Sequence, residues 1–233
     1  MTGPPASLWE VAGPATLGGV DAALLEVVRR DAQPHRFRRG QALFVEGDRA
    51  ERMFLIEEGW VLISILSATG RETVLSLAGP GDLLGDASAV DGSPRSASAT
   101  ALGDVLTLVT PSRVLSEAVS DPELAVGLLR MLAGRLREAD RRRMEFASLD
   151  TLGRVSARLV ELAARFGAEE EDGSVVVELP LSQEQLASWC AASREATVKA
   201  LASLRSLGYV STGRHRVQVH DLDALRDRAV AYR

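Results

Sequence analysis

The period of the apolar residues changes once along this chain of 233 residues, and this change restricts the fold most strongly. Up to about residue 110, short apolar runs are separated by turn signals such as Glu58–Gly59 and Gly79–Asp82. Short strands at near-regular spacing are typical of a β-sandwich, roll or barrel. From Pro122 to about Phe166 the period becomes helical. The apolar runs are Ala42–Val45, Met53–Ile56, Val61–Leu66, Thr73–Leu77 and Val105–Val109.

The helical segment carries an apolar seam with heptad spacing. A seam of this length usually packs against a partner helix, and the preceding β-region has enough apolar residues to close itself. We therefore expect a homodimer, with burial against its own domain as the alternative. Arg143 departs from the pattern and would weaken the pairing or set its register. The seam consists of Leu129, Leu132, Leu136, Ala139, Arg143 and Phe146.

Two shorter helices are expected on either side of the β-region. Val20–Arg30 has apolar residues on one helical face. Pro111 fits the first turn of a second helix, because the N–H that proline lacks would be unpaired there.

Residues 181–219 carry the signals of two short helices and a hairpin. Ser182, followed three residues later by Gln185, forms a capping box that opens the first helix. Ser193 caps the second helix, and Gly208 stops it. A small hairpin follows. Helix, short turn, helix and hairpin predict a winged helix-turn-helix, which is a DNA-binding motif.

The charge is unevenly distributed. The net charge of −5 argues against a protein that coats nucleic acid indiscriminately. From residue 181 to the end, however, eight Lys and Arg residues outnumber five Asp and Glu residues. A slightly basic C-terminal quarter on an acidic body is compatible with a DNA-reading module.

The second of the two short helices begins with polar residues that suit base edges. Arg194 and Lys199 can donate to guanine, and Glu195 can accept from cytosine. The first turns of a recognition helix are the part that reaches the bases. The alternative is an ordinary exposed helix with a Glu195–Lys199 ion pair. The residues expected to contact DNA are Ser182, Ser193, Arg194, Glu195, Lys199 and, on the wing, Arg214.

Four stretches are informative as a set. They are Phe54–Gly59, Leu149–Asp150 with Gly153–Arg154, Ser193–Glu195 and Gly208–Val210. Together they resemble the cyclic-AMP receptor protein (CRP/FNR) family of transcription regulators over nearly the whole chain. The resemblance implies an α+β fold with an N-terminal β-roll of the cyclic-nucleotide-binding type, a long dimerisation helix and a C-terminal winged helix-turn-helix. The expected parts are a flexible lead-in at 1–20, an effector-binding β-roll at 21–110, a linker and dimerisation helix at 111–149, and a DNA-binding domain at 150–233.

The stretch from Leu84 to Ala97 is similar to the phosphate-binding cassette of that family. A glycine lets the backbone approach a ligand closely, a short helix after it presents N–H groups to an anion, and an arginine supplies a fork of donors for phosphate. The alternative is a surface loop whose arginine pairs with a nearby aspartate. The ligand-binding residues expected here are Gly85, Asp86, Ala87, Arg95 and Ser96.

Two departures from the family pattern bear on the effector. The family places a glutamate on the ribose 2′-OH where Asp86 stands, and Asp86 is one methylene shorter. Members that respond to cyclic AMP carry hydroxyl or amide side chains against adenine, where this chain has Ala139 and Asp140. Asp140 can accept from a base, whereas Ala139 cannot hydrogen-bond. The expected effector is cyclic AMP or a related nucleotide, with an effector-independent regulator of the same fold as the alternative.

Other functions are weighed against these residues. A metalloenzyme built on a β-roll needs clustered histidines, but His35 is the only histidine of the β-region. Cys190 is the only cysteine, so the chain's thiols cannot build a disulfide, a Cys-rich zinc site or an iron–sulfur cluster. We therefore expect no catalytic residue, no metal site and no required cofactor. A nucleotide-sensing module that signals to a protein partner is a further alternative, which the winged motif disfavours.

The expected partners follow from the same pattern. They are double-stranded DNA with a palindromic site, RNA polymerase and a second copy of the chain. No run of about 18 apolar residues is present, and the first residues lack the pattern of a signal peptide. We therefore expect no membrane contact and a cytoplasmic location.

Overall fold

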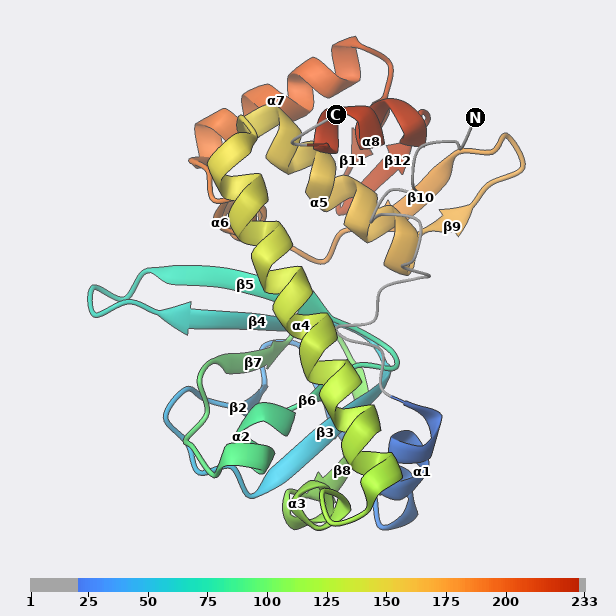
Figure 1. Ribbon diagram of the computed structural model, residues 1–233. Helices are drawn as coiled ribbons and strands as arrows, with labels where there is room; N and C mark the ends of the chain where they lie inside the picture. Colours follow the sequence, from blue (N-terminus) through green and yellow to red (C-terminus); the bar gives the residue numbers. More distant parts are fainter. Residues whose placement is uncertain (1–20, 231–233) are drawn as a thin grey trace, which may run out of the picture.

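The computed structural model describes residues 21–230 and shows two folded parts connected by one long helix (Figure 1). This helix, α4 (Pro122–Ser148), runs from a β-roll at the bottom of Figure 1 to a unit of helices and a small sheet at the top. The flexible lead-in expected at residues 1–20 lies outside the described residues.

The β-roll consists of two four-stranded sheets whose paired strands are antiparallel. Side chains on the strands alternate between the two faces, so that residues such as Ile56 and Val61 are fully buried between the sheets. The expected β-region is thereby confirmed. The first sheet has the order β1 (Gln33–Phe37), β8 (Val105–Pro111), β3 (Arg52–Glu58) and β6 (Leu83–Leu84). The second has the order β2 (Ala42–Phe44), β7 (Ser98–Ala101), β4 (Val61–Leu66) and β5 (Glu72–Ala78).

Three short helices accompany the roll: α1 (Ala22–Arg30), α2 (Asp86–Asp91) and α3 (Arg113–Ala118). The prediction that Pro111 begins a helix was wrong. Pro111 is the last residue of β8 and pairs with Arg52, and α3 begins two residues later. Strand β1 pairs with β8 only as far as Val109, so the missing N–H of proline falls at a strand end where it costs little.

The helical period that begins at Pro122 is divided into two helices. The chain leaves α4 at Leu149, and Asp150 opens α5 (Thr151–Phe166) by accepting the backbone N–H of Gly153 at 2.8 Å. An aspartate at this position satisfies an N–H that the first turn of a helix leaves unpaired. The break therefore falls at Leu149–Asp150, one of the stretches on which the family resemblance rests.

The C-terminal unit contains the predicted winged helix-turn-helix. Ser182 and Gln185 form the expected capping box, and Ser193 caps the second helix by accepting from the N–H of Ala196. The small sheet is larger than the predicted hairpin. The run of three valines at Val175–Val177 has no alternation of apolar and polar residues, so the sequence did not indicate the strand that it forms. The unit consists of α6 (Gln183–Trp189), α7 (Arg194–Ser206), α8 (Leu222–Ala229) and a sheet with the order β11 (Val210–Gly213), β12 (Arg216–Val219), β10 (Val175–Glu178) and β9 (Ala168–Glu169).

One face of α4 leaves large apolar side chains exposed. The exposed fractions of Leu129, Leu136 and Phe146 are 65%, 60% and 63%. Leu132, the fourth large residue of the seam, is instead half-buried and packs against the core that α1, α3 and α4 share with the roll. Large apolar side chains exposed along one helix are typical of an interaction surface.

The C-terminal unit and the roll share one hydrophobic core. Leu62 and Val74 of the second sheet belong to the same buried cluster as Leu159 and Trp189 of the C-terminal unit. At the junction the rings of Trp60 and Phe166 are in contact, with centroids 3.5 Å apart and planes inclined by 40°. Because apolar surface from both parts is buried together, the C-terminal unit is docked on the roll.

Candidate effector cavity and DNA-binding surface

A cavity of about 270 Å³ lies between α2, the second sheet and α4. Gly85, the residue before α2, has a φ of 82°, and a side chain there would collide with the guanidinium of Arg95. The loop therefore needs glycine both for its left-handed backbone and for this close approach. The predicted ligand-binding residues that line the cavity are Gly85, Asp86, Ala87, Arg95 and Ser96.

Asp86 is buried at the base of the cavity, with an exposed fraction of 1%. Its Oδ1 accepts from Arg135 of α4 at 2.7 Å, and Arg135 also donates to the carbonyl of Leu83 at 2.7 Å. A buried carboxylate is tolerated when it is paired in this way. The pair fastens the cassette to α4.

Arg95 is also buried, and it bonds to the backbone of its own chain. Its guanidinium donates to the carbonyl of Gly85 at 2.9 Å and to that of Arg52, and lies over the ring of Phe44 at 4.4 Å from the centroid. Burial lowers the pKa of Arg95, and the charges of Asp48 and Asp86 oppose this shift. These protein partners hold the guanidinium of Arg95 in one position.

Polar atoms without a partner gather at this cavity. Among the buried side-chain atoms of residues 21–230, five have no hydrogen-bond partner, and three of these belong to cavity residues: Asp86 Oδ2, Arg95 Nε and Arg135 Nε. An unpaired buried polar group costs about 1–3 kcal/mol. One acceptor and two donors on residues that line the cavity therefore lack a partner within the described chain.

Of the wall that α4 contributes, the sequence reasoning named Ala139 but missed Arg135, Glu138 and Arg142. The wall residues Arg135, Glu138, Ala139 and Arg142 follow one helical face at spacings of three and four, and all line the cavity. This spacing from Ala139 was the signal that could have found them. Burial alone would raise the pKa of Glu138, but hydrogen bonds and charges from Arg141 and Arg142 lower it to about 2.

Asp140, the sixth predicted ligand residue, is not among the residues that line the cavity of its own chain. It is exposed and pairs with Arg143 at 3.1 Å. One residue further along a helix turns the side chain by about 100°, which takes Asp140 away from the face of Ala139. Contact between Asp140 and a ligand therefore requires the cavity of a second copy.

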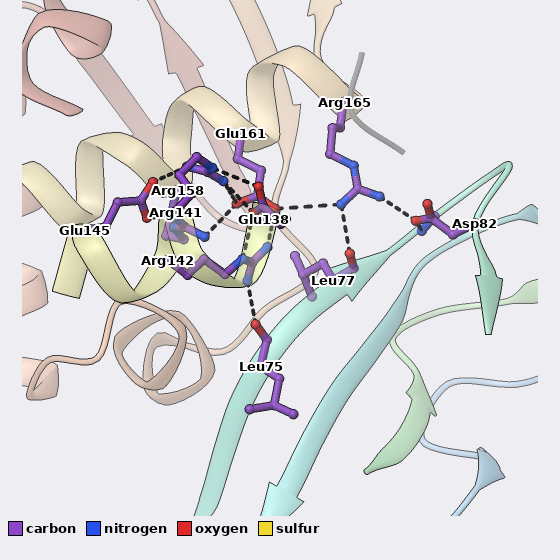
Figure 2. A network of polar contacts seen from close by, with 11 residues as sticks. Leu75, Leu77, Asp82, Glu138, Arg141, Arg142, Glu145, Arg158, Glu161 and Arg165 are labelled. Carbon is purple, nitrogen blue, oxygen red and sulfur yellow. Dashed lines mark hydrogen bonds and ion pairs between the residues drawn. The ribbon is translucent and has the colours of Figure 1, made fainter. Parts of the chain in front are cut away.

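The cavity wall continues into a network of charged side chains that joins α4, α5 and the roll (Figure 2). Arg142 donates to Glu138 at 2.8 Å, to Glu161 of α5 at 2.9 Å and to the carbonyl of Leu75 at 2.5 Å. Arg158 of α5 is almost fully buried between Glu145 and Glu161. The network therefore forms a continuous series of polar contacts from the cavity to α5 of the C-terminal unit.

The predicted DNA contacts lie on the C-terminal unit. Arg194 donates twice to Gln183 at 3.0 and 3.1 Å, and Glu195 pairs with Lys199 at 2.8 Å with both side chains more than three-quarters exposed. Arg214 is exposed in the turn of the hairpin. Recognition helix and wing thus both present cations, as a DNA-binding surface needs.

A second cleft, of about 650 Å³, separates these helices from the β4–β5 hairpin of the roll. Ser182, Ser193 and Arg194 line one side, and Arg71 and Glu72 line the other. The N-terminal ends of α6 and α7 therefore face the hairpin.

Comparison with protein families agrees with this architecture. The model of the cyclic nucleotide-binding domain matches residues 34–121, and that of the Crp-like helix-turn-helix domain matches residues 153–228. A relative from Mycobacterium tuberculosis, the CRP-like cAMP-activated global transcriptional regulator, is 35% identical over 91% of this chain and 94% of its own length. The chain belongs to the CRP/FNR family of transcription regulators. It is accordingly a transcription regulator with a helix-turn-helix DNA-binding domain.

Other relatives and solved structures support the family and the fold. The transcriptional regulator SdrP of Thermus thermophilus is 32% identical over 79% of this chain and 87% of its own. A crystal structure of a CRP/FNR family regulator, also from Thermus thermophilus, is 28% identical with a TM-score of 0.70, covering 84% of this chain and 98% of that one. FixK2 from Bradyrhizobium japonicum, at 22% identity and a TM-score of 0.78, shows the same fold over 87% of this chain and 99% of its own.

Two further observations concern the described residues alone. Within residues 21–230, His, Cys, Asp and Glu side chains form no group of three or more that could hold a metal ion. No helix in that range combines the length and apolar character needed to cross a membrane.

Proposed function

We propose that this regulator is controlled by a cyclic mononucleotide bound in the cavity beside Gly85. The observation that carries the proposal is the set of unpaired buried atoms on Asp86, Arg95 and Arg135. The free carboxylate oxygen of Asp86 suits a ribose hydroxyl, and the free N–H of Arg95 suits a phosphate oxygen. The cyclic nucleotide-binding family match and the cAMP-activated relative support the same ligand class.

Phosphate and ribose, more than the base, are expected to determine affinity. On the base side Ala139 offers no hydrogen bond, and Glu138 and Arg142 are already engaged with each other. Calorimetry with cyclic AMP and cyclic GMP tests the proposal, with Arg95→Ala expected to abolish binding. In the dimer, Asp140→Ala is expected to change the preference between adenine and guanine.

A second candidate is an effector-independent regulator of the same fold. It is favoured by one observation: Asp86 and Arg95 already hold protein partners, Arg135 and two backbone carbonyls. The absence of binding heat with either nucleotide at millimolar concentration would support it over nucleotide control.

We further propose a homodimer that binds a palindromic DNA site. The exposed stripe of Leu129, Leu136 and Phe146 supports pairing of α4 with its copy. Two recognition helices must then lie about 34–36 Å apart to enter successive major grooves. A ligand can shift the position of these helices only through different affinity for the two arrangements.

The DNA contacts can be separated by their roles. Arg194→Ala and Lys199→Ala are expected to relax sequence choice, each costing about 1–3 kcal/mol at its own base pair. Arg214→Ala is expected to weaken binding to all sequences equally and to flatten the salt dependence. If the Arg194→Ala variant still discriminated fully between base pairs at a selected DNA site, α7 would not be the helix that contacts the bases. RNA polymerase as partner and the cytoplasm as location complete the proposal for a regulator of this kind.

A further inference from the structure

Helix α7 turns one face to the core of its own unit and the opposite face to solvent. The buried residues of the helix are Thr197, Ala200 and Leu204. The exposed residues of its first two turns are Arg194, Glu195, Val198 and Lys199. The solvent-facing side of α7 is therefore the side that carries the expected base contacts.

Val198 is the apolar exception on this face. Its exposed fraction is 41%, and within α7 it is the only large apolar side chain that is exposed. It takes part in none of the three hydrophobic clusters found among residues 21–230. A β-branched residue is also less favourable in a helix than alanine. The fold of the single chain therefore gains little from a valine at this position.

The position of Val198 around the helix axis places it among the base contacts. Successive residues of a helix are turned by about 100°, so Val198 lies about 40° from Arg194 and about 60° from Glu195, on the arc between them. Arg194 donates to Gln183 at 3.0 and 3.1 Å, and Glu195 pairs with Lys199 at 2.8 Å. An apolar side chain thus stands between a donor and an acceptor that are expected to contact base edges.

The chemistry of the major groove offers one counterpart for such a side chain. Among the groups that base pairs present there, the C5-methyl of thymine is the apolar one, and the others donate or accept hydrogen bonds. The methyl groups of valine do neither. The cations nearby on α7 and on the wing attract phosphates, so DNA is the occupant that suits this surface.

We propose that Val198 reads the C5-methyl group of a pyrimidine, beside the base pairs that Arg194 and Glu195 contact. The proposal rests on the base contacts of α7 proposed above and adds to them a preference for thymine at one position. The same contact extends to 5-methylcytosine, which carries its methyl group on the same ring carbon. Methylation of cytosine at this position is therefore expected to raise the affinity of the regulator.

The test begins with a DNA site that the full-length wild type selects from a pool of random duplexes at low salt. Each thymine in one half of this site is then replaced by uracil, which removes the methyl group and leaves every hydrogen-bonding group in place. Fluorescence anisotropy compares the affinities of the wild type and of Val198→Ala for each duplex. Val45→Ala is the matched control, because Val45 is an apolar residue of the roll with a similar exposed fraction, 46%.

At one thymine, uracil is expected to weaken binding of the wild type about fourfold, the factor that corresponds to burying one methyl group. Val198→Ala should bind the two duplexes equally, whereas Val45→Ala should keep the difference. Lys199→Ala should also keep it, although its affinity for both duplexes is lower. A C·G pair at the same position is expected to bind the wild type about fourfold more tightly when the cytosine is methylated, and Val198→Ala equally in both states.

The results distinguish the methyl contact from the base contacts of α7. If no thymine could be distinguished from uracil by the wild type, or if the difference persisted in Val198→Ala, the methyl contact would be overturned and the contacts of Arg194 and Lys199 would stand. A pool that yielded no preferred sequence would overturn the base contacts of α7 and the methyl contact with them.

Discussion

One face of α4 buries charged side chains against its own chain, whereas another face leaves large apolar side chains exposed. Glu145 of α4 is buried beside Arg158, while Leu136 and Phe146 are more than half exposed. This inverts the usual pattern, in which charges face water and apolar groups face the core. The two faces therefore differ in their contacts: the charged face bonds to side chains of its own chain, whereas the apolar face is exposed and could pair with the second copy proposed above.

The charged face should be the more sensitive to single substitutions. Arg158→Ala removes a guanidinium that is 4% exposed and takes one partner from each of the buried carboxylates of Glu145 and Glu161, which both keep Arg141. Breaking a buried ion pair on one side costs about 3–5 kcal/mol, and the partner that remains places this loss at the lower end of that range. Urea unfolding of the variant measures this loss.

Arg113→Ala provides the control for that measurement. Its pair with Glu117 on α3 is about two-thirds exposed on both sides, and exposed pairs contribute about 0–1 kcal/mol. Equal losses of unfolding free energy in the two variants would mean that the charged face contributes no more to stability than an exposed ion pair does.

The apolar face should respond in oligomeric state while the fold is retained. Leu129→Lys combined with Leu136→Lys is expected to convert a dimer at micromolar concentration into a monomer with unchanged circular dichroism, because both side chains are exposed in the single chain. Leu132→Lys is less suitable than the sequence alone suggested, since Leu132 also packs in the core of its own chain. Light scattering checks the result, and Val119→Lys, at the residue after α3, is a control at another exposed apolar position. A monomeric wild type would refute the assignment of this face.

These two faces also show how far sequence reasoning could reach. The apolar stripe was visible because its residues repeat with a helical period, and caps such as Ser182 and Ser193 marked helix starts through purely local chemistry. The contacts of charged residues with other elements were missed because those partners are distant in sequence. Arg135 of α4 meets Asp86 across 49 residues, and Arg165 of α5 meets Asp82 across 83. The charge pattern along one helix does not indicate which distant residue will pair with it.

The same limit applies to the cavity. The loop from Gly85 to Ser96 could be predicted because this short stretch of chain resembles the phosphate-binding cassette of the family, and the structure places its residues at the cavity. That Arg95 bonds to the carbonyl of Arg52, and that Arg135 closes the pocket from α4, required the folded arrangement of strands. The wing sheet was likewise predicted only where its strands form a local hairpin, and β10 joins it from outside that hairpin.

The pH dependence of the free energy of unfolding tests the charged face of α4 through Glu138. Hydrogen bonds and charges from Arg141 and Arg142 outweigh burial and hold the pKa of Glu138 at about 2, below its ordinary 4.5. Because the folded-state pKa is the lower one, the ionised carboxylate stabilises the fold above pH 4.5, and this contribution is lost as pH falls toward about 2. Urea unfolding is therefore expected to show a steeper loss across this window for the wild type than for Glu138→Gln. Parallel curves would mean that Glu138 is not held ionised by its neighbours.

The smallest expected effect concerns Arg143, the one charged residue of the apolar seam. Its side chain is 78% exposed and pairs only with Asp140, which is 57% exposed, so Arg143→Leu should change the stability of the monomer by no more than about 0.5 kcal/mol. In the dimer the same change removes a polar seam residue, and such residues specify register at a cost in stability. The dimer should therefore tighten by about tenfold, or ~1.4 kcal/mol, while the monomer is hardly affected. Sedimentation at dilute concentrations measures the first quantity, and Arg113→Leu on α3 should leave it unchanged. Weaker association of Arg143→Leu would show instead that Arg143 makes a favourable contact with the second copy, so that this face would not be purely apolar in the assembly.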